Sequence, residues 1–189
     1  THCISSAASD VYKRQGAETR LDALDFGIPQ SIGEFAVTAF PTSHDAPGSC
    51  GFRLDAAGGA VGVLTDTGYV TDETADILEG VDLAVLEANH DIETLRSGPY
   101  PYYLKQRILG AQGHLSNEDA ARFAAVLAQS GTSEIILAHL SRENNTPAMA
   151  QTAVERALSA AGVSPLLSVA PRDCLGPAHT VSRRSVCRR

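Results

Sequence analysis

Apolar and polar positions alternate along parts of the chain in ways that distinguish strands from helices. Segments rich in strand-forming residues lie at 34–40, 50–55, 60–66, 82–88, 134–140 and 165–170. The AAGG sequence at 56–59 predicts a hairpin between the second and third of these segments. The largely apolar run at 82–88 predicts a strand that is buried on both faces.

Helices are predicted between the later strands. They are expected at 72–78, 91–97, 101–109, 117–129 and from Pro147 to about Ala161. Thr71 and Ser116 are expected to cap two of them, and Gly80 and Gly162 to end two of them. Because a hairpin comes first and helices alternate with strands afterwards, we predict a mixed α/β (α+β) layer architecture in one domain.

Composition narrows the classes of protein that remain. The chain has 189 residues with 43% apolar content, which is typical of one globular domain. Its net charge of −7 argues against a broad basic nucleic-acid surface. No apolar run is long enough to span a bilayer, so no membrane partner is expected. The scattered residues Cys3, Cys50, Cys174 and Cys187 predict free thiols and a cytoplasmic protein.

The two ends of the chain lack the patterning of the middle. Residues 1–15 have no clear periodicity, and the arginine-rich tail has no apolar face. We predict that 1–15 is non-native or disordered, that 16–178 forms the domain and that 179–189 is a disordered tail. A short basic arm for nucleic acid is the alternative interpretation of the tail.

Polar residues that can ligate metals or transfer protons follow several predicted strands. They are His44, Asp66, Glu87, His90, Asp91, His114 and His139. Each has an ordinary structural interpretation: the TDTG sequence is typical of a turn, and Ser116 can cap a helix with His114 beside it by chance. Taken together they also suit a zinc, manganese or iron site. Residue types alone leave both interpretations open.

The order of the motifs resembles a known family. SHDA, TDTG, LEANHD, GHLSNE and AHLSRENN follow one another as in the metallo-β-lactamase superfamily, and most closely in its YycJ/WalJ-type branch. The resemblance covers about residues 30–178. It implies a four-layer αββα sandwich, of which this chain would be the C-terminal portion only.

The resemblance implies a dinuclear centre of two divalent metal ions. His44 and His139 match histidine ligands, and Asp66 matches the aspartate that bridges the two metals. His114 matches a histidine that contacts the scissile phosphate or protonates the leaving group, and Glu87 matches the acidic residue that orients it.

Other residues belong to the same motifs without an assigned role. His90, Asp91 and Asn145 are part of the branch signature. Lys105 and Arg107 could neutralise substrate phosphates, although a solvated helix face is the favoured interpretation of both.

The implied function is that of a metal-dependent hydrolase, most closely a phosphodiesterase or exonuclease acting on DNA. A cyclic-phosphate phosphodiesterase acting on a small molecule is one alternative, and a non-catalytic α/β binding domain is another. The family's main ligand motif, HxHxDH, does not occur in the chain. We therefore expect an N-terminally truncated fragment that is inactive alone.

Overall fold

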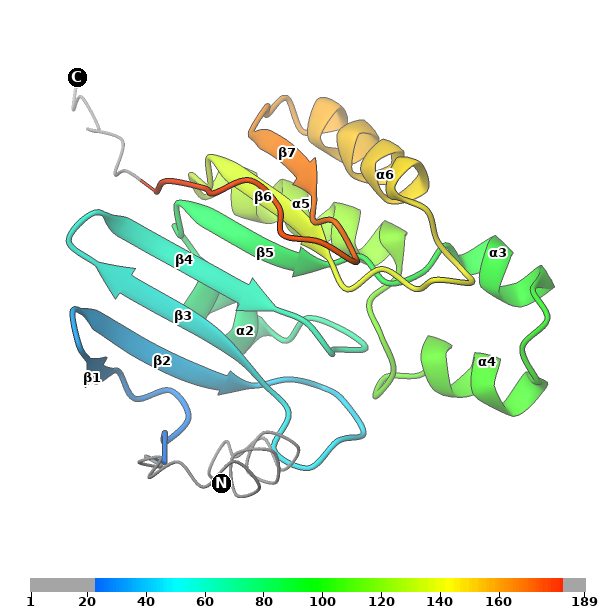
Figure 1. Ribbon diagram of the computed structural model, residues 1–189, viewed down its shortest axis with the longest axis horizontal. Helices are drawn as coiled ribbons and strands as arrows, with labels where there is room; N and C mark the ends of the chain where they lie inside the picture. Colours follow the sequence, from blue (N-terminus) through cyan, green and yellow to red (C-terminus); the bar gives the residue numbers. More distant parts are fainter. Residues whose placement is uncertain (1–22, 182–189) are drawn as a thin grey trace.

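A seven-stranded mixed sheet forms the centre of the computed structural model, which describes residues 23–181 (Figure 1). Its strands lie in chain order: β1 (Gln30–Ile32), β2 (Phe35–Pro41), β3 (Cys50–Ala56), β4 (Gly59–Leu64), β5 (Leu83–Glu87), β6 (Glu134–Ala138) and β7 (Leu166–Val169). Strands β1 to β4 are antiparallel, whereas β4 to β7 are parallel. The C-terminal ends of β4, β5 and β6 therefore meet at one edge of the sheet.

Helices α2 (Asp72–Leu78), α5 (Asn117–Gln129) and α6 (Pro147–Ala160) cover one face of the sheet. Their apolar residues share one core with the sheet, for example Leu78, Leu127 and Val154 with Leu86 and Leu137. Crossovers between parallel neighbours have one hand, so consecutive strands keep their connecting helices on the same side. This core fixes the strands whose ends carry the polar motifs.

Helices α3 (Ile92–Ser97) and α4 (Tyr102–Leu109) do not belong to that layer. They project beyond the sheet edge at which β5 and β6 end, as Figure 1 shows. Helix α4 has no buried residue. We call the segment from α3 to α4 the arm, residues 92–109, because it extends past the strand ends.

The opposite face of the sheet is crossed by the segment after β7. Arg172 donates to the carbonyls of Leu140 and Ser141 at one end of β6, and His179 bonds to Glu134 at the other end. The predicted tail at 179–189 therefore has its first residues within the described structure. The rest of that prediction, and the one for residues 1–15, lie outside the described residues.

The structure confirms most predicted elements and changes a few. Thr71, Ser116 and Thr146 cap α2, α5 and α6 through their side chains. The short strand β1 was not predicted, and β6 ends at Ala138 rather than at residue 140. The prediction of four free cysteines is wrong for Cys50, which is disulfide-bonded, whereas Cys174 is a free thiol. No helix within residues 23–181 has the length and apolar character needed to cross a membrane.

His90 lies in the segment between the end of β5 and the start of α3. Its backbone pairs with Ser116 at the start of α5, and its side chain is 1% exposed. Neither imidazole nitrogen has a hydrogen-bond partner in the described part of the chain. Burial lowers the pKa of His90 to about 4, because the charged imidazolium would lose its hydration there.

This buried histidine should make stability depend on pH. Between pH 6.5 and 4 the unfolded chain binds a proton at His90 that the folded chain does not, so the free energy of unfolding falls as the pH is lowered. The loss should reach about 3 kcal/mol at pH 4. In His90→Leu this part of the loss should disappear, as measured by urea unfolding at several pH values. Identical pH slopes for the two proteins would contradict the prediction.

Candidate metal centre

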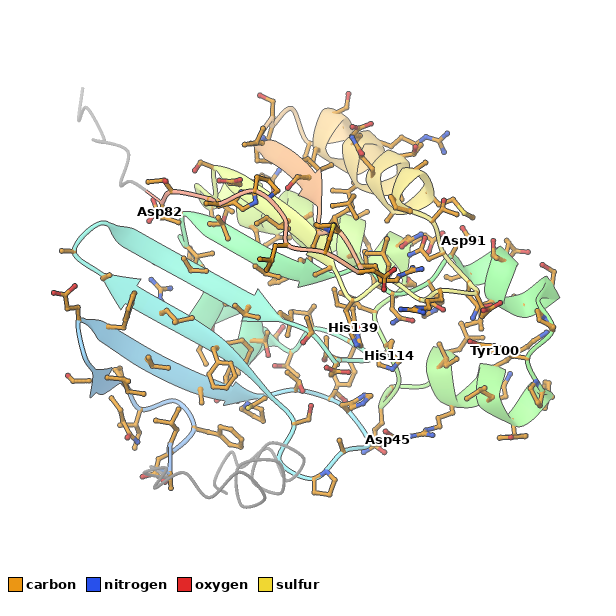
Figure 2. The ribbon with its side chains drawn as sticks, viewed as in Figure 1. Asp45, Asp82, Asp91, Tyr100, His114 and His139 are labelled. Atoms are coloured by element: carbon orange, nitrogen blue, oxygen red, sulfur yellow. The ribbon has the colours of Figure 1, made fainter. Side chains whose placement is uncertain are left out.

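Four strand ends and one loop bring polar side chains together at the sheet edge. His44 follows β2, Asp66 follows β4, Glu87 ends β5, His139 follows β6, and His114 precedes α5. The ring centroid of His114 lies 4.8 Å from that of His44 and 5.3 Å from that of His139. Figure 2 shows His114 and His139 beyond the ends of the strands, with Asp45 nearby. Residues that were chosen from separate motifs therefore form one cluster.

Glu87 is the buried support of this cluster. Its side chain is 0% exposed, and its Oε1 accepts hydrogen bonds from His114 Nδ1 at 2.8 Å and His139 Nδ1 at 2.7 Å. Its Oε2 accepts from the backbone amides of Thr67 and Leu115. A carboxylate acceptor fixes the proton of each ring on Nδ1, so Nε2 is left with a free lone pair.

The pKa values reflect the same contacts. Burial is the largest influence on Glu87 and acts to raise its pKa, but the hydrogen bonds from His114 and His139 help to hold it below its usual range. The hydrogen bond to Glu87 raises the pKa of His139, against burial, which lowers it. Glu87 is therefore ionised at neutral pH, as its role of acceptor for two rings requires.

His44 and Asp66 complete the arrangement. His44 Nδ1 donates to the carbonyl oxygen of Gly113 at 2.9 Å, so its Nε2 is also free as an acceptor. The Nε2 atoms of His44 and His139 each lie 3.7 Å from Oδ1 of Asp66. These separations are too long for hydrogen bonds. They match two donor atoms that share one cation at roughly 2.0–2.2 Å from each.

The backbone is unusual at two of these positions. Asp66 has φ 56° and His139 has φ 58°, both in the left-handed region. Within residues 23–181 they are the only residues other than glycine with positive φ. Such a conformation costs roughly 1–3 kcal/mol and persists where the surroundings enforce it, often at functional sites. Because His139 leaves the extended conformation, β6 ends one residue before it.

The donor set fits a divalent cation. Ligand atoms from Asp66, Glu87, His114 and His139 all lie within 4.8 Å of one another. Of these four residues Glu87 is the poorest candidate for a metal ligand, because both of its carboxylate oxygens already accept hydrogen bonds. It is better suited to orienting the rings than to binding a cation. His44 belongs with the donors instead, given its distance to Asp66.

Several residues named from the sequence lie outside the cluster. Asp91 caps α3 by accepting from the amide and hydroxyl of Thr94, so it has a structural function there. Lys105 Nζ donates to the carbonyl of Arg96, at the end of α3. Arg107 is paired with Asp45, and this hydrogen bond is the main reason that the pKa of Asp45 is lowered. The buried side chain of His90 is not part of the donor set.

Asn145 connects the loops of the cluster through hydrogen bonds of its buried side chain. Its Nδ2 donates to the carbonyls of Ala88 and Asn89 and to Oδ1 of Asn117, and its Oδ1 accepts from Asn117 Nδ2. Asn89 Nδ2 in turn donates to the carbonyl of His139. The sequence motifs included Asn145 but indicated no role for it. They gave no reason to predict a role for Asn89 or Asn117. A buried amide pair of this kind joins residues that are 28 positions apart, so periodicity does not reveal it.

Replacing this amide tests how much the loops depend on it. Asn145→Asp should lower the free energy of unfolding by about 3–5 kcal/mol, because an unpaired charge would face carbonyl oxygens in a buried site. Gln106→Glu is the matched control: it makes the same chemical change on an exposed side chain and should alter stability by less than about 0.5 kcal/mol. Equal unfolding midpoints in urea for the two variants would contradict the interpretation.

Comparison with known proteins places the chain in a family. A family model described as "Beta-lactamase superfamily domain" matches residues 5–140. The exodeoxyribonuclease WalJ of Streptococcus pneumoniae serotype 2 (strain D39 / NCTC 7466) is 42% identical over 137 residues, which cover 72% of this chain and 51% of that protein. The exodeoxyribonuclease YycJ of Bacillus anthracis is 38% identical over 136 residues, which cover 72% and 52%. The chain spans about half the length of these curated relatives.

Solved structures share the fold. The metallo-β-lactamase fold protein YhfI from Bacillus subtilis matches with a TM-score of 0.62 at 19% identity, over 87% of this chain and 59% of that one. The Zn²⁺-bound PqqB from Methylobacterium extorquens matches with a TM-score of 0.56 at 17% identity, over 87% and 59%. These matches agree with the predicted fold class. Because the family model covers residues 5–140, the chain belongs to the metallo-β-lactamase superfamily.

Proposed function

We propose that the cluster binds two divalent cations (zinc, manganese or iron) and that the centre it contributes to hydrolyses phosphodiester bonds of DNA. The observation that carries this proposal is the position of Asp66 Oδ1, 3.7 Å from Nε2 of both His44 and His139. A carboxylate between two imidazoles is suited to bridge two cations, each held by one ring. The names of the relatives, exodeoxyribonucleases at 42% and 38% identity, support DNA as the substrate.

The residues of the chain have separate tasks in this reaction. Cations bound at the site would supply positive charge to a phosphodiester under attack by water. His114 lies between His44 and His139 and donates from Nδ1 to Glu87. When the ring carries a proton on both nitrogens, Nε2 is therefore the atom that would give a proton to the leaving oxygen. Glu87 stabilises the protonated ring and prevents it from rotating. It is therefore a positioning residue, and His114 is the proposed general acid.

The basic side chains of Lys105 and Arg107 are less suited to phosphate binding than the motifs implied. Arg107 is 64% exposed but already neutralised by Asp45, and Lys105 is held at the end of α3. We assign neither residue a required contact with substrate. The proposed site is therefore one in which His44, Asp66 and His139 bind the cations and His114 transfers the proton.

Cation binding gives the first test. In calorimetric titrations of the chain with Mn²⁺ or Zn²⁺, Asp66→Asn should weaken affinity at least about tenfold, because an amide replaces the shared carboxylate. Asparagine tolerates the left-handed backbone at this position, so the fold should be retained. Asp76→Asn, on the exposed side of α2, is the control and should bind as the parent does. Absence of binding by both the parent chain and a chimera that supplies the N-terminal half of the pneumococcal WalJ would favour a non-catalytic binding domain.

Turnover gives the second test. The three proposed ligands offer fewer donor atoms than two four-coordinate cations require, so the chain alone should show no appreciable turnover. A chimera that adds the N-terminal half of the pneumococcal WalJ should degrade DNA with added Mn²⁺, and the same chimera with Asp66→Asn should not. Hydrolysis of a cyclic phosphodiester but not of DNA would favour the alternative phosphodiesterase. Robust turnover by the chain alone would contradict the first expectation.

A further inference from the structure

The arm presents an apolar surface that is not used in the core. Leu104 and Ile108 lie four residues apart, on one side of α4, and Tyr100 precedes the helix on the same side. All three side chains are only partly buried. They line a cavity of about 310 Å³ instead of packing against the sheet. An apolar helix face that borders a cavity has the character of a ligand wall.

The cavity lies directly beside the candidate metal centre. His44 and His114 also line it, together with the ion pair of Asp45 and Arg107 and the amide groups of Asn89 and Gln112. Figure 2 shows Tyr100 on the arm and His114 at the strand ends, and both residues line this cavity. A group held at the cluster therefore has the cavity as its immediate neighbour.

The amide groups of the cavity have unused hydrogen-bonding capacity. Asn89 donates through Nδ2 to the carbonyl of His139, which leaves its Oδ1 free to accept. The side chain of Gln112 makes no hydrogen bond to any residue between 23 and 181, so both its donor and its acceptor are free. Flat apolar contacts with a few polar groups at the margin are what a nucleobase requires.

The volume and the charge limit what can enter. A cavity of about 310 Å³ is at the small end of ligand sites, suited to one nucleoside and not to a stacked base pair. The chain has a net charge of −7, so the phosphate backbone of DNA gains little from long-range attraction. Local contact with a base is then a favourable source of affinity, because stacking on an aromatic ring is independent of sequence.

We infer that this cavity binds one unpaired nucleobase, stacked on Tyr100, of the nucleotide whose phosphate lies at the metal centre. A base inside a duplex is stacked and paired, so it must leave the helix to enter. The base that enters is therefore that of a terminal nucleotide that has left its pair. This inference rests on the proposed function, since the position of the phosphate is taken from it.

Two probes separate the base from the phosphate. Binding of deoxyadenosine 5′-monophosphate and of deoxyribose 5′-phosphate to the chain is measured by calorimetry or NMR titration in Mn²⁺. The nucleotide should bind about 5- to 150-fold more tightly than the sugar phosphate, the range expected for stacking one base on an aromatic ring.

Matched tyrosine variants locate the contact. Tyr100→Ala should remove most of the preference for the nucleotide and leave affinity for the sugar phosphate unchanged, whereas Tyr100→Phe should keep the preference. Tyr103→Ala is the control, because Tyr103 is 74% exposed and does not line the cavity. Thermal unfolding of each variant shows whether its fold is intact.

The outcomes distinguish the two proposals. Equal binding of nucleotide and sugar phosphate, absence of binding by both in Mn²⁺, or equal effects of the Tyr100 and Tyr103 substitutions overturns the base site. Cation binding that persists in the same experiment leaves the metal centre standing. Failure of both the parent chain and the WalJ chimera to bind Mn²⁺ or Zn²⁺ overturns the metal centre instead, whatever the nucleotide does.

Discussion

A carboxylate without access to water needs donors on all sides, and Glu87 obtains them from three separate loops. The amides of Thr67 and Leu115 and the rings of His114 and His139 all point to it. Breaking any one of these contacts leaves charge uncompensated in a buried site, which is costly. The loops after β4 and β6 and before α5 are therefore held in mutual register by one side chain. The directions of both rings follow from that constraint.

The features that could be predicted from the sequence are those that depend on neighbouring residues alone. The caps by Thr71 and Ser116 and the strands of the core follow from periodicity and side-chain type, and the structure has them. The cluster was predictable only as a set of motifs, because its members are far apart in the sequence; Glu87 and His139, for example, are 52 positions apart. The short strand β1 has too few residues to show a period. The left-handed backbone at His139 has no signal in composition either.

In the proposed site, the strand ends bind the cations and the arm contacts the base. Rigid strand ends hold the donors, whereas the arm, which lies outside the core, supplies the apolar wall. Asn89 joins the two, because it contacts the backbone of His139 and also lines the cavity. Changes in the arm can therefore alter the preference for a ligand without disturbing the donors. Substitutions in the asparagine network affect both.

The contacts of Glu87 also have an order in time, because a ribosome releases the chain from its N-terminus. Thr67 lies 20 positions before Glu87, whereas His114 and His139 come 27 and 52 positions after it. A nascent chain that has emerged only as far as α5 holds the carboxylate with an incomplete set of donors, and β5 is then an unpaired edge. Docking of β6 pairs this edge and completes the charge network in one event. Translation pauses before residue 139 would prolong the state that is most exposed to misfolding.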